Sequence, residues 1–340
     1  GPMANRLGTV AGAAALLGLL VGCAGEAGVV VGDSRVADSD TWSDPGDLGH
    51  IDHRTVYACD TVDVLFVVDN SNSMEQEQKN LATNFTSFIT AIEAIQPPIK
   101  SYHVGVISTD VGAGPYSGPL MGSCTPDGDA GKLQHAPKPG KAGCKASYPK
   151  YLQGPGPDVA KDFACIAELG LGGCGYEQQF EAALQALASQ PYNAGFIRKN
   201  APLAIIFVTD EDDCSASDDK LFDPDDSSLG PYPARCVTRP GKLHPVDHYV
   251  KAFKKLKDDD RRLVVGAITG PTGKIEVDKV TGKVTPACSS PAFGSALPGN
   301  RFDKLIKAFG DRGVHASLCQ GDLAKPLGVI GKAIERVCLE

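Results

Sequence analysis

Two short apolar runs that end in aspartate constrain the fold of this chain most strongly. Residues 62–68 (VDVLFVV) are followed by Asp69, and residues 204–208 (AIIFV) are followed by Thr209 and Asp210. Short, nearly continuous apolar runs are typical of central parallel strands that helices cover on both faces. Because ligands bind beyond the carboxyl ends of such strands, the two runs predict a site where their aspartates meet.

The rest of the folded part alternates between strand-like runs and amphipathic helical segments. Apolar residues between 81 and 95 share one helical face, and Pro97-Pro98 ends that helix. Further strands are expected at 102–110, 262–268 and 314–318, helices at 163–169, 180–187, 245–256, 302–309 and 323–337, and a hairpin at 274–285. This alternation predicts an α/β fold with a Rossmann-like, doubly wound, mostly parallel sheet and disulfide-stapled loop insertions.

The first residues predict a lipoprotein signal peptide at 3–23. Arg6 gives a weakly positive start, and the apolar run that follows is shorter than the roughly 20 residues that span a membrane. The ending Leu-Val-Gly-Cys23 resembles the bacterial lipobox, in which the cysteine carries the lipid. An ordinary secretory signal with a chance cysteine is the alternative. No acidic residue follows Cys23 directly, which favours the outer membrane of a bacterial envelope, on its surface or its periplasmic face.

Residues 24–56 are rich in Gly, Ser and Asp, so we expect a flexible acidic tether there and a folded domain at 57–340. The net charge of -8 argues against nucleic acid and against attraction to an anionic bilayer. Membrane contact is therefore expected only through the N-terminal lipid.

The cysteines predict disulfide bonds. Setting Cys23 aside leaves ten of the eleven cysteines, and an even number in an exported chain implies pairing. No Cys-x-x-Cys motif is present. Connectivity does not follow from sequence alone, but we expect neighbours to pair within loops and the two ends of the domain to be tied together: 124–144, 165–174, 214–236, 288–319 and Cys59–Cys338.

The segment after the first strand carries oxygen ligands for a hard cation. Asp69, Ser71 and Ser73 alternate, so an extended loop would place their side chains on one side. Carboxylate and hydroxyl oxygens suit Mg²⁺ and Ca²⁺. The alternative is that Ser73 and Gln76 form a capping box for the following helix, with Ser71 as another possible cap. The second strand, which ends in Asp210, favours the metal site.

Other acidic residues leave more than one interpretation open. Asp110 follows a neighbouring strand, where it could orient a metal-bound water or occupy a turn. Asp212 and Asp213 could support the ligands of the ion without touching it or could bind a second Ca²⁺, but a solvated acidic loop is favoured. The sequence contains no nucleophile elbow, phosphate loop or dinucleotide fingerprint.

Residues 66–74 (FVVDNSNSM) resemble the opening of a von Willebrand factor type A domain with its metal-ion-dependent adhesion site, and residues 206–210 (IFVTD) resemble the later strand and acidic ligand of that family. The blocks 173–178 and 208–215 are similar to bacterial lipoproteins of this type, in particular myxobacterial ones. The resemblance covers roughly residues 60–340. It implies a divalent cation (Mg²⁺ or Ca²⁺, possibly Mn²⁺) with an open position for a carboxylate from a protein or glycan partner.

The resemblance implies that Asp69, Ser71, Ser73 and Asp210 are the metal ligands. The third ligand of the family is usually a Thr before the middle helix, and none lies between residues 170 and 180. Glu177 is the nearest oxygen ligand, and it is either a substitute or a helix-start carboxylate that the helix dipole favours. A charged ligand there would tighten ion binding and make the ion less electrophilic toward an acidic partner.

The sequence therefore predicts a non-enzymatic, divalent-cation-dependent adhesion or binding protein of the bacterial cell envelope. One alternative is a structural subunit of an envelope complex whose ion only stabilises the fold. A less favoured alternative is a metal-dependent hydrolase that uses the acidic cluster at 210–213, which would require a general base and a substrate cleft beside the ion.

Overall fold

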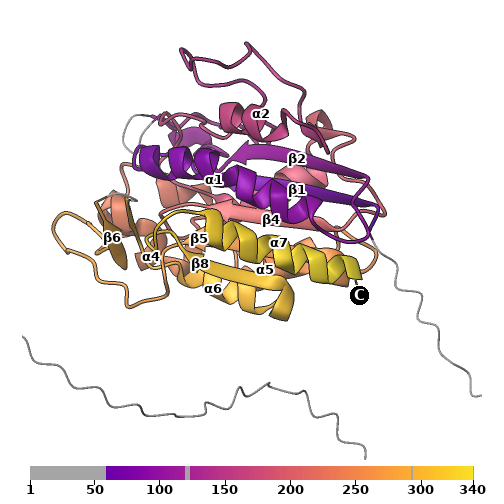
Figure 1. The fold of residues 1–340 in the computed structure, drawn as a ribbon. Coiled ribbons are helices and arrows are strands. Elements are labelled where there is room, and N and C mark those ends of the chain that lie inside the picture. The colour runs from indigo at the N-terminus through magenta and orange to yellow at the C-terminus, as the bar shows by residue number, and fades with distance from the viewer. Residues whose placement is uncertain (1–58, 119–122, 292–293, 340) are drawn as a thin grey trace, which may run out of the picture. The chain divides into compact units, whose positions relative to one another are not determined.

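The computed structural model describes residues 59–118, 123–291 and 294–339 (Figure 1). The predicted signal peptide (3–23), its Cys23 and the tether (24–56) lie outside these residues. The chain divides into two units, residues 1–53 and 54–340, and everything below concerns the second. Across the ranges just given, no helix has both the length and the apolarity that crossing a membrane requires.

A six-stranded sheet with the order β3-β2-β1-β4-β5-β8 forms the centre of the domain. Every neighbouring pair is parallel except β2 and β3 at one edge. The strands of this sheet are β1 (Thr61–Val68), β2 (Ser101–Ser108), β3 (Leu152–Gly154), β4 (Leu203–Val208), β5 (Leu263–Thr269) and β8 (Gly313–Ser317). A separate two-stranded sheet contains β6 (Cys288–Ser290) and β7 (Gly294–Ala296).

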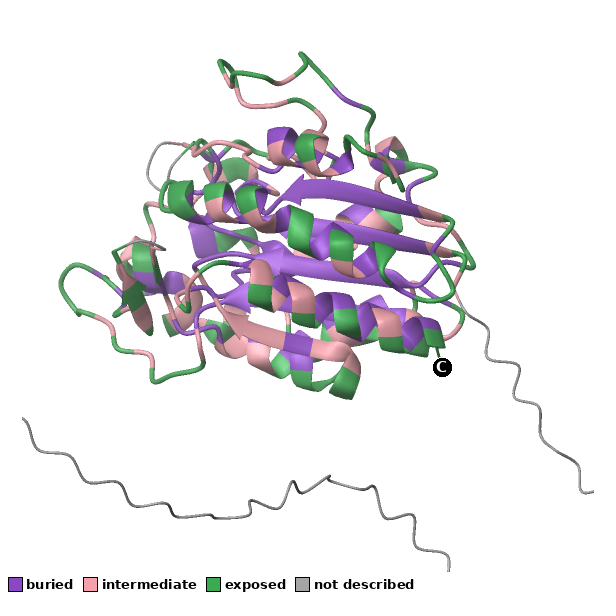
Figure 2. Ribbon diagram, in the orientation of Figure 1, coloured by how far each residue is buried: buried purple, intermediate pink, exposed green. Residues whose placement is uncertain are grey.

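Helices cover both faces of the sheet. They are α1 (Glu75–Glu93), α2 (Val159–Ile166), α3 (Gln179–Leu184), α4 (Arg235–Thr238), α5 (Val246–Lys254), α6 (Asn300–Lys307) and α7 (Ala324–Leu339). Apolar residues of α1, α2 and α7 pack on one face, and those of α3, α5 and α6 pack on the other. The central strands are accordingly buried along their length (Figure 2). The predicted Rossmann-like, doubly wound α/β fold is confirmed.

The alternation of side chains along β1 explains why this strand is central. Val64, Phe66 and Val68 belong to the core beneath α1, whereas Leu65 and Val67 belong to the core beneath α3. Both sets are fully buried, so a strand covered on both faces must be apolar throughout. β1 also lies where the strand order changes direction, since β2 adds on one side of it and β4 on the other. A doubly wound sheet binds ligands at such a point.

Two expected elements differ in the structure. The predicted helix at 180–187 is α3, which passes into a π-helical turn at Gln185–Ser189. The predicted hairpin at 274–285 keeps a single bridge between Val277 and Val284, and the regular hairpin of this region is β6–β7.

The structure contains five disulfide bonds, and the expected pairing is confirmed for Cys59–Cys338, Cys214–Cys236 and Cys288–Cys319. The expected pairs 124–144 and 165–174 are wrong, because Cys124 bonds to Cys174 and Cys144 to Cys165. The reason is that the insertion after β2 folds back over the loop before α3. The Cys174 amide donates to the Asp110 carboxylate at 3.1 Å, which brings that loop beside the start of the insertion.

Candidate metal centre

The parallel register aligns polar residues at the carboxyl ends of neighbouring strands. Val68 lies opposite Ser108 on one side and Val208 on the other. The next residues on these three strands are Thr109, Asp69 and Thr209, and all three side chains are fully buried. The two predicted strands therefore end side by side, as the sequence requires for a shared site.

Neighbouring residues hold the Asp69 carboxylate against β4. Its Oδ2 accepts a hydrogen bond from the Thr209 hydroxyl at 2.6 Å, and its Oδ1 accepts one from the Ser71 amide at 2.8 Å. The Asp69 amide donates to the Val208 carbonyl at 3.0 Å, which extends the strand pairing by one residue. Gln179 of α3 donates in turn to the Thr209 hydroxyl at 3.0 Å. Thr209 and Gln179 thus orient Asp69, although the sequence offered no sign of the Gln179 contact.

The loop that follows Asp69 places two serine hydroxyls close together. The Oγ atoms of Ser71 and Ser73 are 3.3 Å apart, with Ser71 buried and Ser73 exposed. The alternative of a capping box is wrong: Met74 is the N-cap residue of α1, and no side chain makes a capping hydrogen bond there. Neither hydroxyl therefore caps α1, and both could act as metal ligands.

Asp210 lies beside these groups, and one of its oxygens has no partner. The residue is only 5% exposed, its Oδ1 accepts no hydrogen bond, and the Ser73 hydroxyl bonds to its carboxyl group. Burial, followed by the negative charge of Asp69, raises the pKa of Asp210 well above its ordinary value. Buried polar atoms normally have a partner, so this oxygen indicates a place for a cation.

Two glutamates add negative charge to the centre. Glu177 precedes α3 and is almost fully buried; burial, and then the charges of Glu211 and Asp69, raise its pKa well above its ordinary value. Glu211 is partly exposed, and burial, followed by the negative charge of Asp69, raises its pKa to about 7. The structure thus places Glu177 near both aspartates, and its role as a ligand stays a prediction.

Glu77 is a further acidic neighbour that sequence reasoning missed. It belongs to the first turn of α1, where a solvated carboxylate is common. Here the side chain is buried, and neither of its oxygens has a hydrogen-bond partner. Burial, reinforced by the negative charge of Asp69, raises the pKa of Glu77 to about 7.

Close backbone contacts fix the loops that carry these groups. The Gly173 amide donates to the Asn70 carbonyl at 2.9 Å, and a Cβ atom at Gly173 would lie 2.1 Å from the Asn70 side chain. Gln78 donates to the carbonyls of both Asp69 and Gly170, at 2.7 and 2.9 Å. The loop before α3 is therefore locked to the Asp69 loop, which limits where Glu177 can lie.

The acidic residues after Glu211 have a structural role. Asp212 and Asp213 are buried, so the favoured solvated acidic loop is wrong. The Arg301 amide donates to Asp212 at 3.0 Å, and the Arg301 guanidinium donates to Asp213 at 2.9 and 3.0 Å. Arg301 lies in α6, far along the chain, so no local pattern could indicate this pairing. Asp110 is a turn residue, since its two oxygens accept backbone amides from Gly112 and Cys174.

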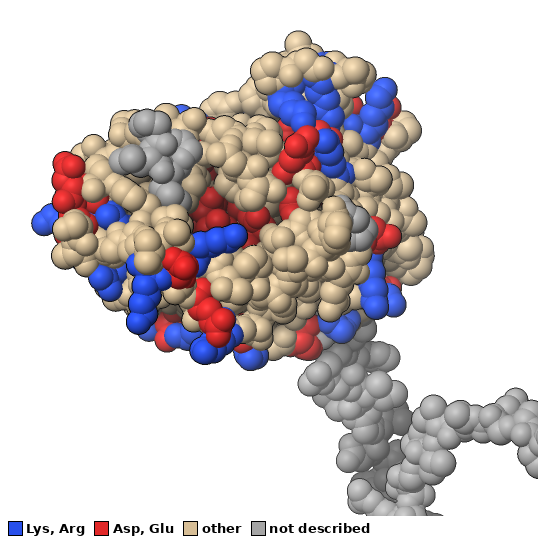
Figure 3. Space-filling view, turned by 90° about the vertical axis from the view of Figure 1, so that its left-hand side faces the viewer, with Lys and Arg blue, Asp and Glu red and all other residues tan. Residues whose placement is uncertain are grey.

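The donor atoms suit a hard cation. Among the described residues, no ion pair joins Asp69, Glu177, Asp210 or Glu211 to a basic side chain. In the same part of the chain, no three His, Cys, Asp or Glu side chains form by themselves a group that could hold a metal ion. A cation at Asp69 and Asp210 would therefore need the serine hydroxyls and water as further ligands. Figure 3 looks onto this edge of the sheet, where acidic side chains lie at the bottom of a hollow and a basic side chain reaches its lower margin.

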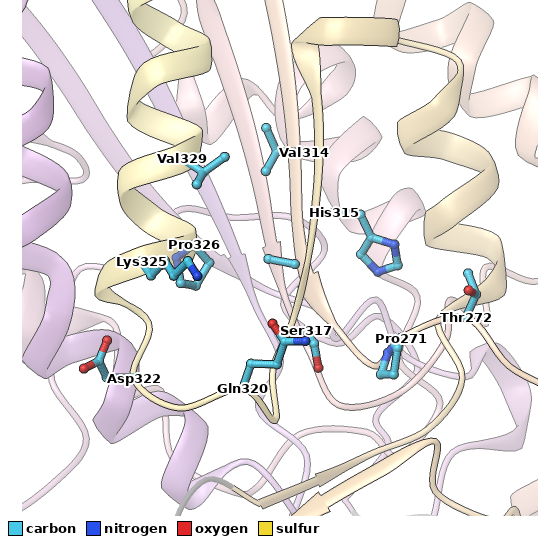
Figure 4. Close-up of a pocket in the computed structure, with 11 residues that line it drawn as sticks. Pro271, Thr272, Val314, His315, Ser317, Gln320, Asp322, Lys325, Pro326 and Val329 are labelled. Atoms are coloured by element: carbon cyan, nitrogen blue, oxygen red, sulfur yellow. The ribbon is translucent and has the colours of Figure 1, made fainter. Parts of the chain in front are cut away.

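A separate cavity of about 390 Å³ lies between β8 and the start of α7. Val314, His315, Lys325 and Val329 are among its lining residues, and none of the predicted ligands is (Figure 4). This cavity is therefore a different feature from the acidic centre.

Together the fold and the site define a Rossmann-like α/β protein with an acidic, hydroxyl-bearing centre at the carboxyl edge of its sheet. No protein-family model matches the chain, and no curated protein matches it significantly in sequence. Among solved structures, it is similar to the conserved hypothetical protein BatB from Bacteroides thetaiotaomicron, with 11% identity and a TM-score of 0.38 over 81% of this chain and 98% of that one. It is also similar to proximal thread matrix protein 1 from the mussel byssus, with 10% identity and a TM-score of 0.37 over 82% of this chain and 49% of the other, so it spans about half of that protein.

Proposed function

We propose that this chain is a divalent-cation-dependent binding protein of the von Willebrand factor type A class. Asp69, Ser71, Ser73 and Asp210 would hold the ion. The observation that supports this most strongly is the buried Asp210 oxygen without a partner, next to the Ser73 hydroxyl and in the field of Asp69. Carboxylate and hydroxyl oxygens thus come together from the ends of two strands that are far apart in the sequence.

Each ligand would have a distinct part. Asp69, held by Thr209 and Ser71, would supply a fixed negative charge to the ion. Ser71 and Ser73 supply neutral oxygens, and the exposure of Ser73 marks the open side. A bound Mg²⁺, Ca²⁺ or Mn²⁺ would present an open coordination position to an oxygen of a partner. The resemblance implies that this oxygen belongs to a carboxylate, and Glu177 is our candidate for a fifth ligand.

The domain would act at the bacterial outer membrane, attached through a lipid on Cys23 and separated from the membrane by residues 24–56. A Cys23→Ser variant, expressed with its signal segment, is expected to leave the detergent-soluble membrane fraction. Retention of that variant in the membrane fraction would contradict a lipid anchor at this position.

A structural role for the ion is the second candidate. The observation in its favour is the pair Glu177 and Glu211, because extra carboxylates hold an ion tightly and reduce its attraction for an acidic partner. The variant Ser71→Ala with Ser73→Ala separates the two candidates. Partner binding is lost in this variant if the ion is the contact point, and it persists if the ion only stabilises the fold.

A hydrolase is disfavoured by a specific contact. Arg301 binds two of the four acidic residues at 210–213, Asp212 and Asp213, so neither of these two is a free general base. We therefore propose a binding protein in preference to an enzyme.

Calorimetric titration with Ca²⁺, Mg²⁺ and Mn²⁺ tests the proposal. The unaltered chain is expected to bind one ion, and Asp210→Asn is expected to weaken binding by at least about 10-fold, because altering even an outer-shell partner of a metal ligand has that effect. Asp258→Asn is the matched control, since Asp258 is 83% exposed and pairs with Lys199. Equal affinity of the two variants would refute the site.

A further inference from the structure

The strand β8 is an edge of the sheet, and its outer backbone groups have no partner. It pairs with β5 alone, and most of its residues are only half-buried, whereas β5 is buried throughout (Figure 2). The Leu318 amide donates to the Thr269 carbonyl of β5 at 2.8 Å, so the backbone groups of the alternate residues His315 and Ser317 point away from β5. Within the described residues, no hydrogen bond reaches these outward amides and carbonyls. An unpaired edge of this kind is a template for another extended segment.

The cavity of about 390 Å³ is lined from both sides of this edge. Pro326 and Val329 of α7 lie on one side of β8, and His315 and Thr272 lie on the other (Figure 4). Val329 is 46% exposed, which makes it one of the few large apolar side chains that the described part of the chain leaves exposed. An added strand would direct alternate side chains to the two sides of β8, so the cavity offers a separate place for each set.

The α7 side of this edge is basic. Lys325 lines the cavity, and the Arg336 guanidinium donates to the Asp311 carbonyl, just before β8 begins. Among the described residues, neither of these two cations takes part in an ion pair. Glu335 is the only acidic residue of α7, and it lies on the side that faces α1, one turn after Gly331, where a Cβ atom would be 2.8 Å from an α1 side chain.

These charges favour an acidic segment over a second copy of this chain. Antiparallel pairing of two β8 edges would place both α7 helices on the same face of the joined sheet, where Lys325 and Arg336 of the two copies would repel each other. Asp322 is the one acidic residue among those that line the cavity, and its carboxylate accepts the Ala324 amide at 3.1 Å. The unpaired cations beside the edge therefore fit carboxylates from a partner.

The spacing along α7 indicates which residues the segment needs. Lys325 and Val329 lie one helical turn apart, which is about 6 Å along the helix axis. Residues on the same side of a strand repeat at about 6.7 Å. An acidic residue opposite Lys325 would therefore be followed, two positions along, by an apolar residue opposite Val329, and a second acidic residue beyond it would approach Arg336.

We propose that β8 binds an extended acidic protein segment as an additional strand, with carboxylates at Lys325 and Arg336 and an apolar side chain between them at Val329. This surface is separate from the acidic centre, so the inference does not depend on the proposed function.

Fluorescence anisotropy of the labelled peptide Thr-Asp-Thr-Val-Thr-Asp-Thr with the full chain tests this inference. The order of its residues is the same in both directions, so it suits a parallel or an antiparallel added strand. The peptide is expected to bind, and Lys325→Glu is expected to weaken binding about 5- to 10-fold, because an attraction becomes a repulsion. Lys332→Glu is the matched control, since Lys332 is exposed on the same helix and does not line the cavity. Its affinity is expected to stay unchanged.

A second peptide separates backbone pairing from side-chain attraction. The same peptide with N-methylated amides keeps its side chains and loses its hydrogen-bond donors, so it is expected not to bind. Hydrogen exchange at the His315 and Ser317 amides is expected to slow when the unmodified peptide is added. The inference would be overturned if the unmodified peptide did not bind, or if the methylated peptide bound equally well. Equal loss of affinity in Lys325→Glu and Lys332→Glu, or unchanged exchange at these two amides, would overturn it as well.

Discussion

Replacing Glu77 with Gln tests whether repulsion between the carboxylates of the acidic centre destabilises the metal-free protein. Burial raises the pKa of Glu77 from 4.5 to about 7. A carboxyl group whose pKa is raised on folding stabilises the fold below its unfolded pKa, and this stabilisation is lost as the pH rises through about 7. Glu77→Gln removes the titrating group, so the variant is expected to gain stability relative to the unaltered chain as the pH rises.

The magnitude follows from the two pKa values. Between pH 5 and pH 8 they correspond to a change of about 2.5 kcal/mol, at 1.36 kcal/mol for each pH unit. Solvent screening reduces this to roughly 1–2 kcal/mol. The fixed cost of burying the Gln amide is the same at both pH values, and it cancels in the difference.

The assay is urea unfolding of both proteins at pH 5 and pH 8, with a chelator present. Glu75→Gln is the matched control, because Glu75 lies in the same turn of α1, is exposed and pairs with Lys79. Glu75→Gln is expected to give no gain at pH 8, and saturating Ca²⁺ is expected to diminish the effect of Glu77→Gln. An equal free-energy difference at the two pH values for Glu77→Gln would refute the reasoning.

Three further changes test separate parts of the structure. Thr209→Val removes a hydrogen-bond donor to the metal-site carboxylate and is expected to weaken Ca²⁺ binding roughly 10- to 100-fold in calorimetry. Arg301→Met leaves Asp213 buried and unpaired, so it is expected to lower the free energy of unfolding by about 3–5 kcal/mol in a urea titration. Replacing Cys59 and Cys338 together with Ser opens a loop with a sequence separation of 279, which is expected to cost about 4–5 kcal/mol by the same measurement.

A specific result would contradict each of these three predictions. Thr83→Val is the control for Thr209→Val, since Thr83 is exposed on α1 and its hydroxyl donates only to its own helix. Equal Ca²⁺ affinity of the two variants would show that the Thr209 hydroxyl does not position the Asp69 carboxylate. A loss below about 1 kcal/mol for Arg301→Met would mean that solvent reaches the carboxylate it leaves behind. Unchanged stability of the double Ser variant would indicate that other contacts already hold the two ends together.

The architecture followed from local patterns along the chain. A continuous apolar run can be satisfied only by a strand covered on both faces, so β1 and β4 were predictable, and so was the meeting of Asp69 with Asp210. The helix α1 followed from its apolar periodicity. The signal for the site was the polar residue at the end of each strand, because parallel strands bring their carboxyl ends to the same edge.

The missed features depend on contacts between distant parts of the chain. Asp213 looks like a solvated residue until Arg301 is brought beside it from α6. The disulfide partners of Cys124 and Cys144 depend on how the insertion after β2 folds back, which sequence spacing does not encode. Glu77 occupies a position where helices commonly expose a carboxylate, and only the packing of the surrounding chain buries it.

The most direct measurement is an electron-density map of the protein crystallised with Ca²⁺. We predict one ion at the carboxyl edge of the sheet, with the Ser71 and Ser73 hydroxyls and an Asp210 or Asp69 oxygen at about 2.3–2.6 Å. The account would be contradicted if, in crystals saturated with Ca²⁺, these serine and aspartate oxygens contacted only water. An ion bound at another place would contradict it as well.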